Sequence, residues 1–138
     1  RIPDRRDHLH RLTEADLLLD TPVYNSHSSA LDALWCGIPI VTAQSTSFAS
    51  RVCGSLLRHI GLDRLVGNSL EEYEAIGARL VEDPPRLRQL RQEIRDGVRM
   101  ARLFDVPQYT QHLERAFEHM HRRRCGGLGA AAWDVPAT

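Results

Sequence analysis

The chain has 138 residues, which suits one compact domain or one lobe of a larger enzyme but not a two-lobed catalyst. Apolar residues make up 42% and charged residues 26%, which excludes a mainly disordered chain, and no apolar run approaches the roughly 20 residues of a membrane-spanning helix. The formal net charge is zero, and all 18 basic residues are arginines, which excludes lysine-based Schiff-base or P-loop chemistry within the chain.

The first half of the chain alternates short apolar runs with helical patterns. A short helix is expected near His8–Leu12, followed by a buried strand over Ala15–Asp20. A second helix is expected from Ser28 to about Cys36, where Gly37 stops it, and residues 40–42 form the next strand.

The pattern continues through the middle of the chain. Ser47 is expected to cap a helix from Phe48 to about Ile60, and 65–66 is a further short strand. The next helix opens at Asn68 or Ser69, where Ser69 and Glu72 have capping-box spacing.

Two more helices complete the expected elements. Asp83 and Pro84 suit the cap and first position of a helix over 84–102, and a last helix runs from about 107 to 123. Residues 125–138 are glycine-rich and lack periodicity, so we expect a disordered tail after a folded part over 1–124.

Short strands that alternate with helices predict an α/β fold: a Rossmann-like parallel sheet flanked by helices. Ligands of such folds bind at the carboxyl ends of the strands, where the strand-to-helix loops open onto helix N-termini. The loop that follows Asp20 is therefore the first candidate for a binding site.

The helix expected after this loop places hydrogen-bond donors at its start and an acceptor one turn further along. A helix that starts at Ser28 presents free N–H groups and a partial positive charge, to which the Ser28 and Ser29 hydroxyls and the His27 imidazole add further donors for a phosphate. Asp32 lies one turn deeper, where a carboxylate can accept hydrogen bonds from a ribose diol. This order suits a nucleoside diphosphate. The alternative is that the serines are ordinary caps, His27 a solvated loop residue and Asp32 a charge in the first helical turn.

Metal and redox sites are not indicated. There is no Asp-x-Asp pair and no His, Cys or carboxylate cluster with metal-ligand spacing, so we expect neither a metal nor a cofactor. Cys36, Cys53 and Cys125 are odd in number and far apart, which fits neither a disulfide framework nor a Cys-x-x-Cys site. A reducing cytoplasm is the expected compartment.

Residues 16–53 carry a specific combination of motifs: Leu-Asp-Thr, Asn-x-His, Asp-x-Leu-Trp-x-Gly-x-Pro and Ala-Ser-Arg-Val, in that order. The combination closely resembles the C-terminal catalytic lobe of the O-linked N-acetylglucosamine transferases, including bacterial relatives that carry tetratricopeptide repeats. The likeness continues through Gln108-Tyr109-Thr110 and covers roughly residues 5–122. It implies the end of the C-terminal lobe of a two-lobed GT-B glycosyltransferase, with UDP-N-acetylglucosamine as donor and Ser/Thr hydroxyls of proteins as acceptors.

The resemblance also implies roles for single residues. By motif position, His27, Ser28 and Ser29 match a His-Thr-Thr that holds the donor diphosphate, and Asp32 matches an aspartate that binds ribose. His8 and Arg11 match a His-x-x-Arg that orients the uracil, with His10 as a competing ring, and Arg5 falls where the family has a lysine near the nucleotide. A solvated basic start of a helix is the alternative for residues 8–11.

Two positions near the second strand qualify the match. Gln44-Ser45-Thr46 stands where the family usually has Pro-Gly-Glu, and the missing glycine changes how closely the backbone can approach a sugar or phosphate. Arg51 occupies the arginine of Ala-Ser-Arg-Val, where we expect it to pair with a helix or loop carboxylate; the alternative is a direct contact with the donor.

We therefore expect a glycosyltransferase fragment that binds UDP-N-acetylglucosamine and, with an N-terminal lobe and tetratricopeptide repeats outside this chain, supports inverting transfer to protein acceptors. The chain starts at Arg1 without a leader, which fits a fragment; alone it is expected to be inactive, and its catalytic base is not identifiable. One alternative is a non-catalytic UDP-binding module or degenerate transferase remnant. Another alternative is a nucleic-acid interaction domain, because the excess of basic residues lies in residues 84–124. We prefer to interpret these arginines as solvated helix faces. Neither nucleic acid nor a membrane is expected as a partner.

Overall fold

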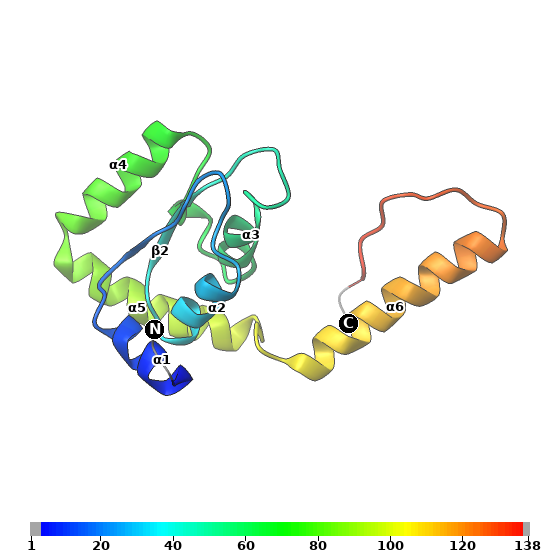
Figure 1. Cartoon of the computed structure of the whole chain (residues 1–138), viewed down its shortest axis with the longest axis horizontal. Helices are drawn as coiled ribbons and strands as arrows, with labels where there is room; N and C mark the ends of the chain where they lie inside the picture. The colour runs from blue at the N-terminus through cyan, green and yellow to red at the C-terminus, as the bar shows by residue number, and fades with distance from the viewer. Residues whose placement is uncertain (1–3, 137–138) are drawn as a thin grey trace. The chain divides into compact units, whose positions relative to one another are not determined.

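A computed structural model describes residues 4–136 and divides the chain between Leu103 and Phe104 into two compact units (Figure 1). Each unit is described by itself, as unit 1 and unit 2. The elements of unit 1 are α1 (Arg5–Thr13), β1 (Leu18–Leu19), α2 (Ser28–Trp35), β2 (Ile40–Ala43), α3 (Val52–His59), the 3-10 helix η1 (Asp63–Leu65), β3 (Val66–Gly67), α4 (Leu70–Val81) and α5 (Pro84–Met100).

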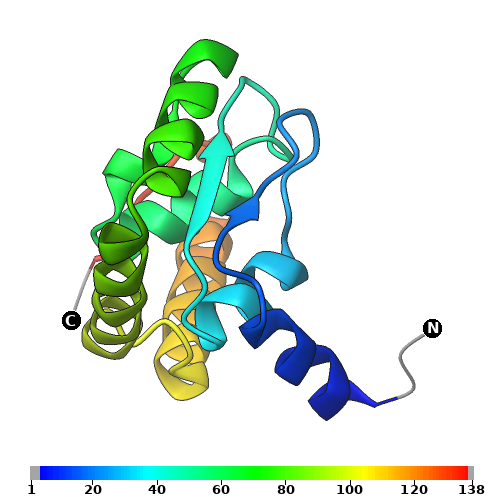
Figure 2. The same cartoon turned by 90° about the vertical axis from the view of Figure 1, so that its left-hand side faces the viewer.

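Unit 1 is built on a parallel sheet in the order β1-β2-β3. Leu18 pairs with Ile40, and Thr42 pairs with Val66, so β2 is the middle strand, and it is buried along its whole length. The helices α2 and α3 cover one face of the sheet, while α4 crosses the other face (Figure 2). The predicted α/β fold with a parallel sheet flanked by helices is confirmed.

Two predicted boundaries were wrong. The helix expected from Phe48 begins at Val52, because the Ser47 hydroxyl accepts from Ser50 N (3.2 Å) and Arg51 N donates to Phe48 O (3.1 Å), which makes a turn of the intervening residues. The first strand covers only Leu18–Leu19, since Ala15 N still bonds to Leu12 O (3.0 Å) at the end of α1.

Two predicted helix caps, Ser69 and Asp83, are confirmed, whereas Ser47 caps no helix. Ser69 Oγ accepts from Glu72 N (3.2 Å), and Asp83 Oδ1 accepts from Arg86 N (3.0 Å). The carboxylate of Glu72 reaches back to Asn68 N (2.8 Å), one residue earlier than a standard capping box requires. Each such cap contributes roughly 1 kcal/mol to helix stability.

The core of unit 1 lies between the sheet and its helices. Burial of each large aliphatic side chain stabilises the unit by roughly 1.5–3 kcal/mol. Its largest fully buried aliphatic side chains are Leu34, Ile38, Ile40, Val41, Leu57, Leu65, Leu90 and Ile94.

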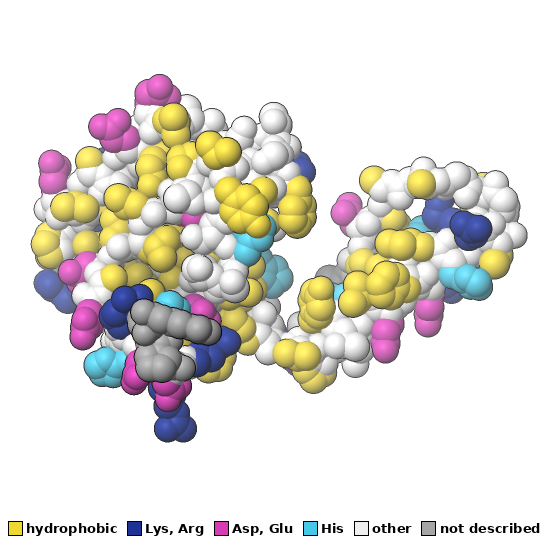
Figure 3. All heavy atoms as spheres, in the orientation of Figure 1, with side chains coloured by type: hydrophobic (Ala, Val, Ile, Leu, Met, Phe, Trp, Pro, Cys, Tyr) yellow, Lys and Arg dark blue, Asp and Glu magenta, His cyan; other side chains and the backbone are white. Residues whose placement is uncertain are grey.

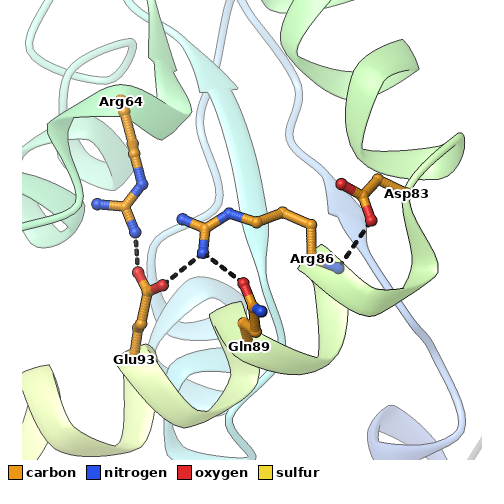
Figure 4. Close-up of polar contacts among 5 residues, drawn as sticks. All are labelled: Arg64, Asp83, Arg86, Gln89 and Glu93. Atoms are coloured by element: carbon orange, nitrogen blue, oxygen red, sulfur yellow. Dashed lines mark hydrogen bonds and ion pairs between the residues drawn. The ribbon is translucent and has the colours of Figure 1, made fainter.

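An arginine–glutamate–arginine cluster ties η1 to α5 (Figure 4). Arg86 Nη1 donates to Glu93 Oε1 at 2.6 Å, and Arg64 donates to the other oxygen of the same carboxylate. Burial lowers the pKa of Arg64, and the neighbouring charge of Arg86 lowers it further. Glu93 therefore holds together two cations that would otherwise repel each other.

Unit 2 consists of α6 (Val106–Cys125) and an extended segment. Trp133 stacks on His119 with ring centroids 4.0 Å apart, and Arg123 Nη2 donates to Gly129 O at 2.7 Å. Hydrophobic side chains of α6 remain at the surface (Figure 3): Val106, Tyr109, Leu113, Phe117 and Met120. The disordered tail expected over 125–138 stays a prediction, although Cys125 itself belongs to α6.

No helix within residues 4–136 combines the length and the apolar character needed to cross a membrane.

Two glycines inside helices give opposite predictions. A Cβ at Gly97 of α5 would lie 2.6 Å from the backbone oxygen of Ile60, whereas a Cβ at Gly77 of α4 would make an ordinary 3.4 Å contact with Leu19. We expect Gly97→Ala to lower the free energy of unfolding by about 1–3 kcal/mol through overpacking, and Gly77→Ala to raise it by up to about 1 kcal/mol through helix propensity. Urea unfolding measures both. Equal effects of the two substitutions would contradict the packing of α5 against Ile60.

Candidate functional site

The candidate site lies on the loop between β1 and α2, which leaves the carboxyl end of β1. Asp20 begins the loop with a side chain only 2% exposed. Its Oδ1 accepts from Ser26 N and its Oδ2 accepts from the Thr42 hydroxyl, both at 2.7 Å. A buried carboxylate is costly unless it is hydrogen-bonded, so these two bonds fix the loop to the middle strand. Sequence reasoning missed this positioning role of Asp20.

Asn25 fixes the middle of the same loop and is 1% exposed. Its side-chain Nδ2 donates to Thr21 O (3.0 Å) and Ala43 O (3.3 Å), while its backbone N donates to Ala49 O (2.9 Å). Asn25 thereby connects the β1–α2 loop both to the end of β2 and to the loop before α3. The Asn-x-His motif contained this signal, but the motif alone does not say what the asparagine binds.

His27 is the N-cap residue of α2, and its side chain makes no capping hydrogen bond. The first N–H groups of α2 are thus left for another acceptor, in contrast to α4 and α5, whose caps are occupied. Ser28 and Ser29 follow as exposed residues at this helix end. The structure therefore brings together the three residues predicted to hold a diphosphate.

A second group of predicted residues converges on Asp32, one turn into α2. Arg5 Nη2 lies 2.8 Å from Asp32 Oδ1, and His8 Nε2 lies 3.5 Å from Asp32 Oδ2. The Asp32 side chain is 18% exposed and the Arg5 side chain 77%, so solvent screens the pair and it adds little stability. Arg11 and His10 of α1 are exposed and, among the described residues, form no ion pair with Asp32, so the structure does not bring Arg11 into this group.

The imidazole of His27 contacts two aromatic rings. It stacks on Tyr24 with ring centroids 4.9 Å apart and an interplanar angle of 17°, and it meets Phe48 edge-on at 6.3 Å. Its Nε2 is buried without a hydrogen-bond partner among the described residues.

Arg51, in the loop after β2, does not pair with a carboxylate as expected. Arg51 Nε donates to the backbone oxygen of Ser47 (3.2 Å), so its partner is a carbonyl rather than a carboxylate. Gln44, the first residue of Gln44-Ser45-Thr46, accepts a hydrogen bond from Arg58 and donates to Asn68 Oδ1 (3.0 Å). These two bonds fix its side chain.

A cavity of about 440 Å³ opens beside this loop at the carboxyl ends of the strands. His27 and the serines of α2 do not line it, so the candidate site lies at the helix end rather than within this cavity. The cavity is lined by Pro22, Val23, Ala43, Gln44, Ser45, Ser47, Ser50, Ser69 and Leu70.

Several arginines that made the chain look basic are engaged within the protein. Arg86 binds Glu93, Arg91 lies 3.7 Å from Asp16, and Arg99 lies 2.7 Å from Asp96. These contacts favour structural and solvated helix faces over a phosphate grip; the absence of nucleic-acid binding stays a prediction. Within residues 4–136, no three His, Cys, Asp or Glu side chains are placed to share a metal ion.

Comparison with known proteins matches most of the chain to one family. Residues 1–113 match the model of glycosyl transferase family 41. The chain is 37% identical over 124 residues to a probable UDP-N-acetylglucosamine–peptide N-acetylglucosaminyltransferase, SEC, of Arabidopsis thaliana, covering 89% of this chain and 13% of the relative. A UDP-N-acetylglucosamine–peptide N-acetylglucosaminyltransferase of Caenorhabditis elegans is 36% identical over 127 residues, covering 92% of this chain and 11% of the relative.

A solved structure agrees with these relatives. An O-GlcNAc transferase of Thermobaculum terrenum, a lysine-to-methionine mutant, superposes with a TM-score of 0.83 at 36% identity. The match covers 90% of this chain and 24% of that chain, so this chain corresponds to a small part of a GT-B glycosyltransferase. The resemblance predicted from the motifs is confirmed.

The surroundings of Asp20 predict an order of cysteine reactivity. Burial raises the pKa of the Cys53 thiol, and the nearby Asp20 charge raises it further; burial and Asp32 raise the pKa of Cys36. Because the thiolate is the nucleophile, we expect iodoacetamide to alkylate exposed Cys125 first, Cys36 more slowly and Cys53 last. Peptide mass spectrometry follows the three sites, with the urea-unfolded chain as control. Fast alkylation of Cys53 in the folded chain would contradict the burial of this thiol beside Asp20.

Proposed function

Because the chain belongs to glycosyl transferase family 41, we propose that it forms the donor-binding part of a UDP-N-acetylglucosamine–peptide N-acetylglucosaminyltransferase. The observation that carries the proposal is the convergence of two predicted groups on α2: His27, Ser28 and Ser29 at its N-terminus, and Arg5 and His8 around Asp32. The fold brings Arg5 to Asp32 although the two residues lie 27 positions apart.

The geometry supports a division of labour along α2. Its N-terminal N–H groups and two exposed hydroxyls offer donors to the diphosphate, and the helix dipole adds a favourable field. Asp32, already oriented by Arg5, offers carboxylate oxygens to the ribose hydroxyls. His8 of α1 lies beside Asp32, and we assign it to the base of the same nucleotide. Arg11 belongs to the proposal through the family motif only.

The proposed reaction is an inverting transfer. The acceptor Ser or Thr oxygen forms a bond to C1 of the sugar while the bond from C1 to the β-phosphate oxygen breaks, so UDP leaves with the electron pair. The end of α2 and His27 would stabilise the charge that develops on that phosphate. The hydroxyl proton passes to a base that none of the assigned residues supplies.

The remaining parts of the function lie outside the assigned residues. We propose that an N-terminal lobe and tetratricopeptide repeats of the full-length protein supply the acceptor site and the base. We also propose a reducing cytoplasm, which the three free cysteines support.

Donor binding is tested by calorimetry with UDP on the purified chain. We expect UDP to bind, without loss in EDTA because helix N–H groups and hydroxyls replace a cation. Ser28→Ala and Asp32→Asn should each weaken binding about tenfold, the effect of one lost hydrogen bond to a charged group. Ser55→Ala, an exposed serine of α3, serves as the matched control. A folded chain that does not bind UDP, or an unchanged UDP affinity in both site variants, would contradict the assignment of the donor site to α2.

Transfer is tested separately. We expect the isolated chain to bind the donor without glycosylating a Ser/Thr peptide, because its assigned residues stabilise the leaving group but hold no base for the acceptor. Mass spectrometry of the peptide detects the product, and a full-length relative is the positive control. Steady transfer by this chain alone would show that the acceptor base lies within it.

A further inference from the structure

The His27 imidazole is held in an unusual way for a residue expected to meet an anion. Its Nε2 is buried and lacks a hydrogen-bond partner among the described residues, although it belongs to a helix end open to a ligand. A buried polar atom without a partner costs free energy, and such atoms are rare in folded proteins. The side chains around the imidazole therefore decide what can reach this nitrogen.

The two rings that contact the imidazole come from two different loops. Tyr24 lies on the β1–α2 loop and stacks on His27, and Phe48 lies on the loop before α3 and meets the ring edge-on. Both distances fall within the range of favourable aromatic pairs. The imidazole is therefore enclosed on its face and on its edge.

The backbones that carry the two rings are tied together. Asn25, next to Tyr24, donates from its backbone N to the oxygen of Ala49, next to Phe48, at 2.9 Å. The buried side chain of Asn25 anchors the same point to Ala43 at the end of β2. The backbone positions that carry the two rings are thus fixed relative to each other.

The rings themselves are only lightly packed. Tyr24 is 64% exposed and Phe48 is 75% exposed, and hydrophobic side chains reach the surface of unit 1 next to a histidine (Figure 3). Exposed side chains change rotamer on fast timescales, so the rings can move while their backbones stay fixed. A lightly packed enclosure can open without unfolding either loop.

We infer that Tyr24 and Phe48 are positioning residues that form an aromatic clamp on His27, keep water from its Nε2, and part when a phosphate oxygen of the donor takes up that nitrogen. The identity of the ligand in this inference rests on the proposed function. The enclosure of the imidazole rests only on the ring contacts. A site from which water is excluded strengthens a hydrogen bond between imidazole and phosphate.

Carbethoxylation by diethyl pyrocarbonate tests the enclosure, because the reagent attacks unprotonated imidazole nitrogens that it can reach. Peptide mass spectrometry compares His27 with exposed His10 in the same sample. We expect His27 to react about tenfold more slowly than His10, and Tyr24→Ala or Phe48→Ala to remove most of that difference. Tyr24→Phe keeps the stacked ring and should behave as native, as should Val23→Ala at an 85% exposed position of the same loop. Circular dichroism verifies folding of each variant.

UDP calorimetry on the same variants tests the link to the ligand. We expect Tyr24→Ala and Phe48→Ala to weaken UDP binding about five- to tenfold, with native affinity restored in Tyr24→Phe. Unchanged His27 labelling in the alanine variants would overturn the clamp. Faster labelling with unchanged UDP affinity would overturn its positioning role. Absence of UDP binding by the native chain, with labelling as expected, would instead overturn the donor site and the ligand half of the inference.

Discussion

The buried carboxylate of Asp20 is the constraint on which the candidate site depends. It sits at the carboxyl end of β1, accepts one hydrogen bond from the loop at Ser26 and another from β2 at Thr42. The backbone oxygen of Asp20 also accepts a hydrogen bond from the Tyr73 hydroxyl (3.0 Å). Tyr73 belongs to α4, which covers the face of the sheet opposite to α2. One residue therefore joins the loop, the middle strand and the covering helix. The start of α2 is fixed in space because this charge must be satisfied.

The two helices that carry the predicted donor contacts are positioned by different means. α2 is held by the sheet through the anchored loop, whereas α1 meets α2 through Arg5, His8 and a contact between the Cys36 thiol and Leu9 O (3.6 Å). The first attachment is buried and the second is largely exposed. The N-terminal end of α2 is thus more rigidly held than the contact between α2 and α1, which suits the proposed electrostatic role of that end at a phosphate.

Sequence reasoning recovered the parts of the structure that local chemistry dictates. Gly37 and Gly61 end their helices with φ of +73° and +75°, and Ser69 and Asp83 cap the helices that follow them, as predicted. The start of α3 could not be predicted, because the serines at 47 and 50 satisfy each other in a turn instead of capping a helix. The enclosure of His27 could not be predicted from the sequence either, because Tyr24 and Phe48 reach the imidazole from two different loops.

The sequence separation of the two Asp20 bonds bears on how the chain folds. Ser26 follows six residues later, but Thr42 follows 22 residues later, beyond the whole of α2. Parallel strands cannot pair by a hairpin, so the carboxylate stays in water until that long loop has closed and β2 has docked. Charge burial and strand pairing therefore belong to one cooperative step. An isolated helix as short as the eight residues of α2 is marginal in water, so α2 gains its stability in the same step.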